Sequence, residues 1–211
     1  MVRMAQYVPP VSIHTLTHTA PGLVIHYPQV YGLMNPGAEE AINRAIILQI
    51  QDMQREQQQV QTGTNPQTTG NFEIKTNERG ILSLVLTNYT YSEHMAHGYT
   101  VTKGLTFATA TGKSYALSDL FRPGSGYQAV LAAEVNRQIK ERGIPVLENV
   151  PVTVSPNQDF YLADKSLVIF YPLYAITPYY VGFPMFPVSV YDLLGLAAEN
   201  GLLSDLAADV A

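Results

Sequence analysis

The chain has 211 residues, of which 46 % are hydrophobic and 14 % are charged. This composition excludes an intrinsically disordered chain, and the length suits one domain or two small ones. The absence of cysteine excludes a disulfide scaffold, an iron–sulfur protein and a thiol nucleophile. The chain has 17 acidic and 12 basic residues, which gives a formal net charge of −5. We therefore expect no basic surface that would bind nucleic acid or an anionic membrane.

The first 22 residues carry threonine, histidine and proline but few apolar positions, and they predict an irregular or loosely strand-like lead segment. The start of the chain lacks the roughly 7–15-residue apolar run of a signal peptide. No stretch of about 18 apolar residues occurs that could span a bilayer. As written, the sequence therefore favours a cytoplasmic location and predicts no direct insertion into a membrane.

A strand and a long helix are predicted next. The run Leu23 to Val30 is apolar and rich in β-formers, with an interruption at Pro28. Asn35-Pro36 is typical of a helix start, because asparagine caps free amides and proline fits the first turn. Apolar residues then recur every three or four positions, which predicts an amphipathic helix to about residue 57. The polar tract 57–69 is predicted to be a mobile loop.

After this tract the apolar period changes from 3.6 to 2. Strand-like runs cover residues 72–76, 81–91 and 99–110, and a fourth strand is expected at 113–117. In the second run, Leu82, Leu84 and Leu86 share one face. The opposite face is shared by Val85, Thr87, Tyr89 and Tyr91. These runs predict an antiparallel meander.

A second helix is predicted from residue 127, where apolar residues occur at every fourth position until Gly143 ends it. Further strands are expected at residues 159–163, 167–171 and 188–190. The tail is predicted to be helical with a break at Asn200-Gly201. The order of elements predicts an α+β fold, in which an antiparallel meander sheet packs against two main helices, with a short C-terminal helix.

The segment Glu93-His94-Met95-Ala96-His97 is the one candidate for metal or acid–base chemistry. Zincin helices place two histidines four apart with a glutamate directly after the first, and this segment has neither feature. It also falls between two strands, so we expect loop histidines and predict no metal site and no cofactor. The sequence has no local signature of a catalytic serine, a P-loop or a dinucleotide-binding fingerprint. A hydrolase that uses His97 with a carboxylate stays open as an alternative.

Tyrosine is unusually frequent, with 14 residues against 7 phenylalanines and no tryptophan, and many tyrosines lie among prolines in the C-terminal third. A tyrosine ring offers a broad apolar face and a hydroxyl, which suits contact with sugars, peptides or proteins. The same rings would equally well wall a core. Stacking on nucleic-acid bases is not expected, because it needs a positive groove.

Several sequence blocks occur in a characteristic order. The region from Gly104 to Phe121 contains F…TGK.Y.L.DLF, residues 159–163 read DFYLA, residues 174–182 contain Y.I.PY..G, and PVSVYDL follows at 187–193. In this order they resemble the domain of RsiV-type anti-sigma factors, which is shared with the N-terminal region of PdaC-type peptidoglycan deacetylases and was catalogued as a domain of unknown function. The resemblance covers about residues 23–195.

The resemblance implies an organisation as well as a function. It implies a lead segment at 1–22, a single α+β domain at 23–195 made of modules 23–91 and 92–195, and a tail at 196–211. In the anti-sigma relatives this region lies outside the cell and senses lysozyme. The implied location is therefore extracytoplasmic, and the implied partner is a protein, with lysozyme as the candidate, or a peptidoglycan-type glycan.

Two departures from the relatives narrow this expectation. Of their Gly-Gly-Ala-His motif only Ala96 and His97 are present, because this chain reads His94-Met95 before them. The membrane anchor, the sigma-binding segment and the catalytic domain of the deacetylase are missing, so a direct anti-sigma role is not expected.

The leading hypothesis is a non-catalytic binding or sensing module. Its candidate binding residues are His97, Tyr171, Tyr174, Tyr179 and Tyr180. A cytoplasmic regulatory or scaffold protein is the alternative that the missing export signal favours.

Overall fold

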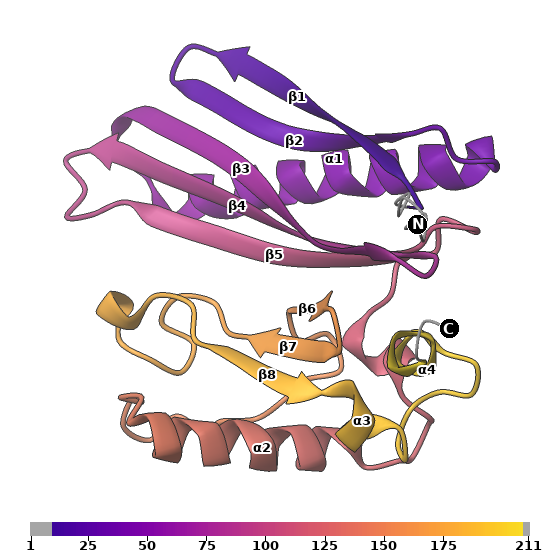
Figure 1. Ribbon diagram of the computed structural model, residues 1–211. Coiled ribbons are helices and arrows are strands. Elements are labelled where there is room, and N and C mark those ends of the chain that lie inside the picture. Colours follow the sequence, from indigo (N-terminus) through magenta and orange to yellow (C-terminus); the bar gives the residue numbers. More distant parts are fainter. Residues whose placement is uncertain (1–9, 209–211) are drawn as a thin grey trace, which may run out of the picture.

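The structure, a computed structural model, describes residues 10–208. Figure 1 shows two sheets, each with one long helix on a face. The five-stranded sheet has the order β1 (Ser12–Ala20), β2 (Leu23–Tyr31), β3 (Thr64–Glu78), β4 (Ile81–Glu93), β5 (Tyr99–Ala108), and the three-stranded sheet has the order β6 (Phe160–Ala163), β7 (Ser166–Phe170), β8 (Met185–Ser189). The α-helices are α1 (Pro36–Val60), α2 (Tyr127–Arg142), α3 (Val190–Leu193) and α4 (Leu202–Ala207), and the 3-10 helices are η1 (Leu117–Leu120) and η2 (Tyr179–Val181). The predicted fold class is confirmed: α+β, with a mostly antiparallel five-stranded sheet, main helices and a short C-terminal helix.

Helix α1 begins and packs as its sequence predicts. The Asn35 side chain accepts hydrogen bonds from the amides of Gly37 and Ala38, and Pro36 occupies the first turn. The buried stripe of α1 packs against the alternate leucines of β4 in one core, whose central members are Ile42, Ile46, Ile50, Met53, Leu82, Leu84 and Leu86. Burying each such side chain contributes roughly 1.5–3 kcal/mol, so this face alone secures the helix on the sheet.

The β1–β2 hairpin is attached to the rest of the sheet in an unusual way. Strands β2 and β3 are parallel and pair only from Leu23 to Ile25, with α1 as the crossover between them. Beyond this point Pro28 has no N–H for a ladder. The side-chain amide of Asn43 instead bonds both backbone groups of Val30, with N···O distances of 2.8 Å each. A helix side chain thus replaces the missing strand partner.

Strand β6 crosses the face of the first sheet that α1 leaves free. The Thr76 hydroxyl donates to the Leu162 carbonyl at 2.8 Å, and the Leu162 amide donates to the Ser83 hydroxyl at 2.9 Å. A Cβ at Gly104 of β5 would collide with the carbonyl oxygen of Phe160, so glycine is needed for this close approach. The two sheets are joined by these contacts and by a small apolar cluster between them that includes Val85.

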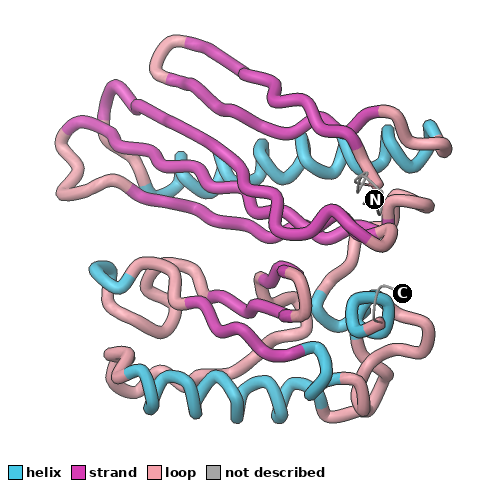
Figure 2. Tube along the Cα trace, in the orientation of Figure 1, coloured by secondary structure: helices cyan, strands magenta, loops and turns pink. Residues whose placement is uncertain are grey.

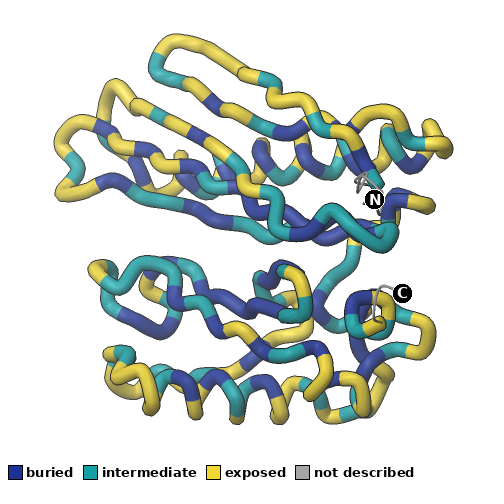
Figure 3. Tube along the Cα trace, viewed as in Figure 1, coloured by how far each residue is buried: buried dark blue, intermediate teal, exposed yellow. Residues whose placement is uncertain are grey.

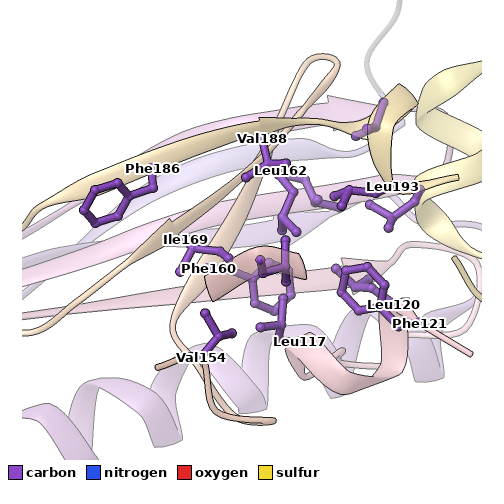
Figure 4. Packing of buried hydrophobic residues seen from close by; sticks show 14 of the residues in the cluster. Leu117, Leu120, Phe121, Val154, Phe160, Leu162, Ile169, Phe186, Val188 and Leu193 are labelled. Atoms are coloured by element: carbon purple, nitrogen blue, oxygen red, sulfur yellow. The ribbon is translucent and has the colours of Figure 1, made fainter. Parts of the chain in front are cut away.

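The second core fills the space between the three-stranded sheet and α2. Figure 4 shows its side chains from the three strands and from η1. Leu131 and Val135 of α2 are fully buried there, and α2 ends at Gly143 with a φ of 62°, as its sequence predicts. Helices α3 and α4 close the same core through Leu193 and Leu203. The molecule therefore has one apolar core under each long helix, and Figure 3 shows both as buried segments.

Two segments of the N-terminal half are more regular than predicted. From Ser12 onward the lead segment, expected to be irregular or loosely strand-like, is a regular strand, because the Pro21-Gly22 turn folds it onto β2; residues 1–9 of that prediction lie outside the described residues. The expected mobile loop 57–69 is instead the last turn of α1 and the start of β3, visible in Figure 2. Two of its glutamines, Gln57 and Gln61, point into the fold, where they hydrogen-bond backbone carbonyls that apolar residues would leave unpaired.

The strand predicted at 113–117 is also wrong. Only a single bridge joins Phe107 to Ser114, after which η1 begins. The Asp119 carboxylate accepts the Ala116 amide at 2.9 Å, and this contact favours a helical turn over a longer hairpin.

Truncation of either core is expected to destabilise the fold. Leu84→Ala and Leu131→Ala each remove a fully buried side chain and should lower the free energy of unfolding by about 2–5 kcal/mol. Urea denaturation followed by circular dichroism measures this change. His94→Ala, in an exposed loop, is the control and should stay within about 0.5 kcal/mol. Unchanged midpoints for both leucine variants would contradict the two-core arrangement.

Candidate functional site

Three of the five candidate binding residues meet at one end of the molecule. His97 lies in the loop between β4 and β5, and Tyr174 and Tyr179 lie in the segment between β7 and β8; both segments are at the left end of Figure 1. The ring centroids of His97 and Tyr179 are 4.3 Å apart, and those of Tyr174 and Tyr179 are 5.5 Å apart. We call these three residues the His97 cluster. It joins parts of the chain that belong to different sheets.

Hydrogen bonds fix the orientation of the His97 ring. Its Nδ1 lies 2.8 Å from the Gly98 carbonyl oxygen, and because a carbonyl can only accept, Nδ1 carries the proton. In the neutral ring Nε2 is then an acceptor, and the Tyr174 hydroxyl lies 3.3 Å from it as donor. The Tyr179 hydroxyl donates to the same Gly98 carbonyl at 3.0 Å. The cluster is therefore a hydrogen-bonded unit as well as an aromatic one.

The end of helix α1 positions the loop that carries His97. The Gln61 side chain donates to the His97 carbonyl at 3.0 Å and accepts the Ser92 amide at 2.9 Å. One turn earlier, Gln57 donates to the Asn88 carbonyl at 2.8 Å. Both glutamines are buried. The sequence does not predict this role, since its one signal is two glutamines four residues apart at the end of an amphipathic pattern.

Tyr174 occupies a backbone position that favours glycine. The Ala175 amide donates to the Pro172 carbonyl at 3.2 Å, which makes Tyr174 the third residue of a tight turn with a φ of 62°. A left-handed conformation costs a non-glycine residue on the order of 1–3 kcal/mol. The side chain is nevertheless 48 % exposed, so burial does not repay this cost in full.

Two more exposed tyrosines flank the cluster. Tyr180 follows Tyr179 in η2 and is 78 % exposed. On the other side, Tyr89 of β4 lies so close to Gly98 that a Cβ there would collide with its ring. The sequence predicts a strand at Tyr89 but no place for it in the site, although the alternate tyrosines of β4 are a signal for an exposed aromatic face.

Tyr171 does not join this surface, which corrects its place among the candidates. It is only 4 % exposed, its ring packs edge-on against Phe186, and its hydroxyl donates to the Thr153 carbonyl at 2.9 Å. Burial raises the pKa of its phenol to about 12. Tyr171 is a core residue because it continues the inward-facing pattern at the end of β7.

The arrangement is an exposed aromatic surface held together by hydrogen bonds. Within residues 10–208, no group of three or more histidine, aspartate or glutamate side chains is placed to hold a metal ion. His97 is exposed, and its ring contacts are two tyrosines and a carbonyl oxygen. Nothing in this geometry positively indicates enzymatic activity. Among the helices of the described segment, none combines the length and apolarity needed to cross a membrane.

Comparison with solved structures shows the fold class. A DUF3298-family member from Bacteroides fragilis NCTC 9343 superposes with a TM-score of 0.70 at 12 % identity, covering 94 % of this chain and 98 % of its own. A DUF3298-family protein from Pseudomonas aeruginosa PAO1 gives a TM-score of 0.65 at 15 % identity, covering 92 % and 96 %. At these identities the likeness establishes the fold alone.

Sequence comparison adds one segment to this result. Residues 118–191 match the family described as "Protein of unknown function (DUF3298)". This segment includes α2, the three-stranded sheet and the tyrosines of the cluster, but not His97. No curated protein matches the chain.

Loss of the Gln61 side chain is expected to loosen the His97 loop. Gln61→Leu leaves the Ser92 amide and the His97 carbonyl without their partner, at a cost of about 1–3 kcal/mol. Hydrogen exchange should become faster in residues 92–98. Gln59→Leu, an exposed change two residues earlier on the same helix, is the matched control. Equal exchange in both variants would show that Gln61 does not hold the loop.

Burial of Tyr171 predicts a loss of stability in alkali. Unfolded tyrosine releases its proton near 10.0, whereas the folded phenol keeps it to about 12, so the folded state binds more protons between these values. The free energy of unfolding should therefore fall as pH rises through this window. Tyr171→Phe should remove this contribution and, through the lost hydrogen bond, cost about 1 kcal/mol at neutral pH. Denaturant titrations at several pH values measure both effects; identical alkaline slopes in the two proteins would contradict the prediction.

Proposed function

We propose that this protein is a non-catalytic binding module that recognises its partner through the His97 cluster and Tyr180. The observation that carries the proposal is the exposed Tyr174 ring on a backbone position suited to glycine. Strained residues that persist on a surface concentrate at functional sites, because function retains what stability alone would remove. A partner that covers this ring buries the Tyr174 side chain and so offsets the cost of its strained backbone.

The surface is also prepared for binding before a partner arrives. Tyr174 and Tyr179 are held by hydrogen bonds to the His97 loop, and Gln61 holds that loop from below. Tyrosine loses little rotamer entropy on contact and offers a ring face together with a hydroxyl. Pre-organisation lowers the cost of association, so a small patch of this kind gives useful affinity.

The resemblance to RsiV-type and PdaC-type domains suggests what the partner is. It points to an extracytoplasmic module whose partner is a protein, with lysozyme as the candidate, or a peptidoglycan-type glycan. The net charge of −5 favours a basic protein partner, since opposite net charges speed encounter. The exposed tyrosine rings also suit the apolar faces of sugars.

Two substitutions test the proposal without removing core residues. Tyr174→Gly and Tyr180→Ala should each weaken binding by about tenfold, which corresponds to about 1.4 kcal/mol, a typical cost of losing an aromatic contact. Isothermal titration calorimetry with lysozyme, and separately with soluble peptidoglycan fragments, measures the affinity. Tyr174→Gly should change the melting temperature little, because the relief of the φ of 62° offsets the loss of the hydrogen bond to His97.

Tyr191→Ala is the matched control. Tyr191 is half-exposed like Tyr174 but lies on α3, in a different part of the fold. It should bind as the unmodified protein does. Absence of binding to both ligands, or equal loss in all three variants, would overturn the proposal.

A further inference from the structure

Strand β1 is an open edge of the five-stranded sheet. Within the described residues, it pairs only with β2, through an unbroken register of nine residue pairs. Figure 3 shows most of the strand as exposed. Edge strands usually block further pairing with charged side chains, proline or a bulge. β1 has none of these, so its outer backbone groups are free to pair with another strand of matching pattern.

The five central residues of β1 read the same in both directions. His14-Thr15-Leu16-Thr17-His18 is a palindrome around Leu16. If two copies pair antiparallel about a twofold axis at Leu16, His14 lies opposite His18 and Thr15 lies opposite Thr17. An interface of this symmetry requires a surface that is complementary to itself, and a palindromic strand satisfies this requirement.

The hydrogen-bond register agrees with this axis. The two-residue turn Pro21-Gly22 closes between Ala20 and Leu23, so alternate residues counted back from Ala20 bond to β2. Leu16 belongs to that set, while the amides and carbonyls of Thr15 and Thr17 point away from β2. Pairing about Leu16 places Thr15 opposite Thr17 of the second copy, and both present outward groups. In a register shifted by one residue, the outward amides and carbonyls of one copy would lie opposite residues whose amides and carbonyls already hydrogen-bond to β2 in the other copy.

The charge distribution favours a second copy on this edge. From Met4 to Ala38 the chain has no aspartate, glutamate, lysine or arginine, although the whole chain carries −5. Two copies of the chain, which carry the same net charge, can therefore meet along this hairpin without placing like formal charges opposite one another. A strongly charged partner would find no counter-charge here.

We propose that the protein forms a twofold-symmetric dimer in which the β1 strands of two copies pair antiparallel about Leu16. The dimer joins the two five-stranded sheets into one continuous sheet. This assembly is independent of the proposed partner recognition by the His97 cluster, which lies on other elements.

A single cysteine tests the register directly, because the chain has none of its own. At the axis, Leu16 faces its own copy in a non-hydrogen-bonded pair, where Cα atoms are about 4.5 Å apart, within the roughly 4.4–6.8 Å range of disulfides. Leu16→Cys should form a covalent dimer under mild oxidation, seen on a non-reducing gel and reversed by a thiol reductant. Leu48→Cys, an exposed position on α1, is the matched control and should stay largely monomeric.

Sedimentation velocity of the unmodified protein gives an independent measurement. We expect a concentration-dependent dimer that Thr15→Pro abolishes, because proline removes an outward amide that β2 does not use. The melting temperature of Thr15→Pro, measured at low concentration, should match that of the unmodified monomer. A monomer at every concentration from micromolar to millimolar, or equal cross-linking of the two cysteine variants, would overturn the proposal.

Discussion

The arrangement of this molecule depends on one crossing, in which the backbone of β6 lies across the first sheet. The Thr76 and Ser83 hydroxyls satisfy the backbone groups of Leu162, and Gly104 leaves room for the chain to pass. This contact fixes where the β7–β8 connection emerges. As a result, tyrosines of the second sheet reach the loop of the first, and His97 meets a hydroxyl that is 77 positions away in the sequence.

Sequence patterns correctly predicted the features that depend on residues adjacent in the chain. The cap at Asn35, the leucine alternation in β4 and the stop at Gly143 each depend on neighbours in sequence, and all three are confirmed. The buried polar contacts were not predictable from the sequence. The hydrogen-bond partners of Gln61 are backbone atoms about 30 positions or more away in the chain, and composition does not reveal them. Tyr171 and Tyr174 look alike in sequence, yet a tight turn between them sends one ring inward and the other outward.

The candidate surface also explains why family-level similarity says little about function here. The matched segment 118–191 contributes the tyrosines, whereas the histidine comes from outside it. The solved structures share the fold at 12–15 % identity, a level at which side chains on surface loops vary freely. A surface assembled from two sheets must therefore be judged by its own geometry.

The asparagine contacts of the β1–β2 hairpin have a mechanical consequence. Asn43 bonds both backbone groups of Val30, and Asn77 does the same for Val11 with N···O distances of 3.2 and 2.9 Å. Each asparagine amide contributes one local pair of hydrogen bonds, whereas a continuous strand ladder would hold the hairpin along its whole length. The hairpin is therefore held by a short parallel seam, by two asparagine side chains and by the buried side chains of Val11, Ile25 and Val30, and local opening has to break all three together.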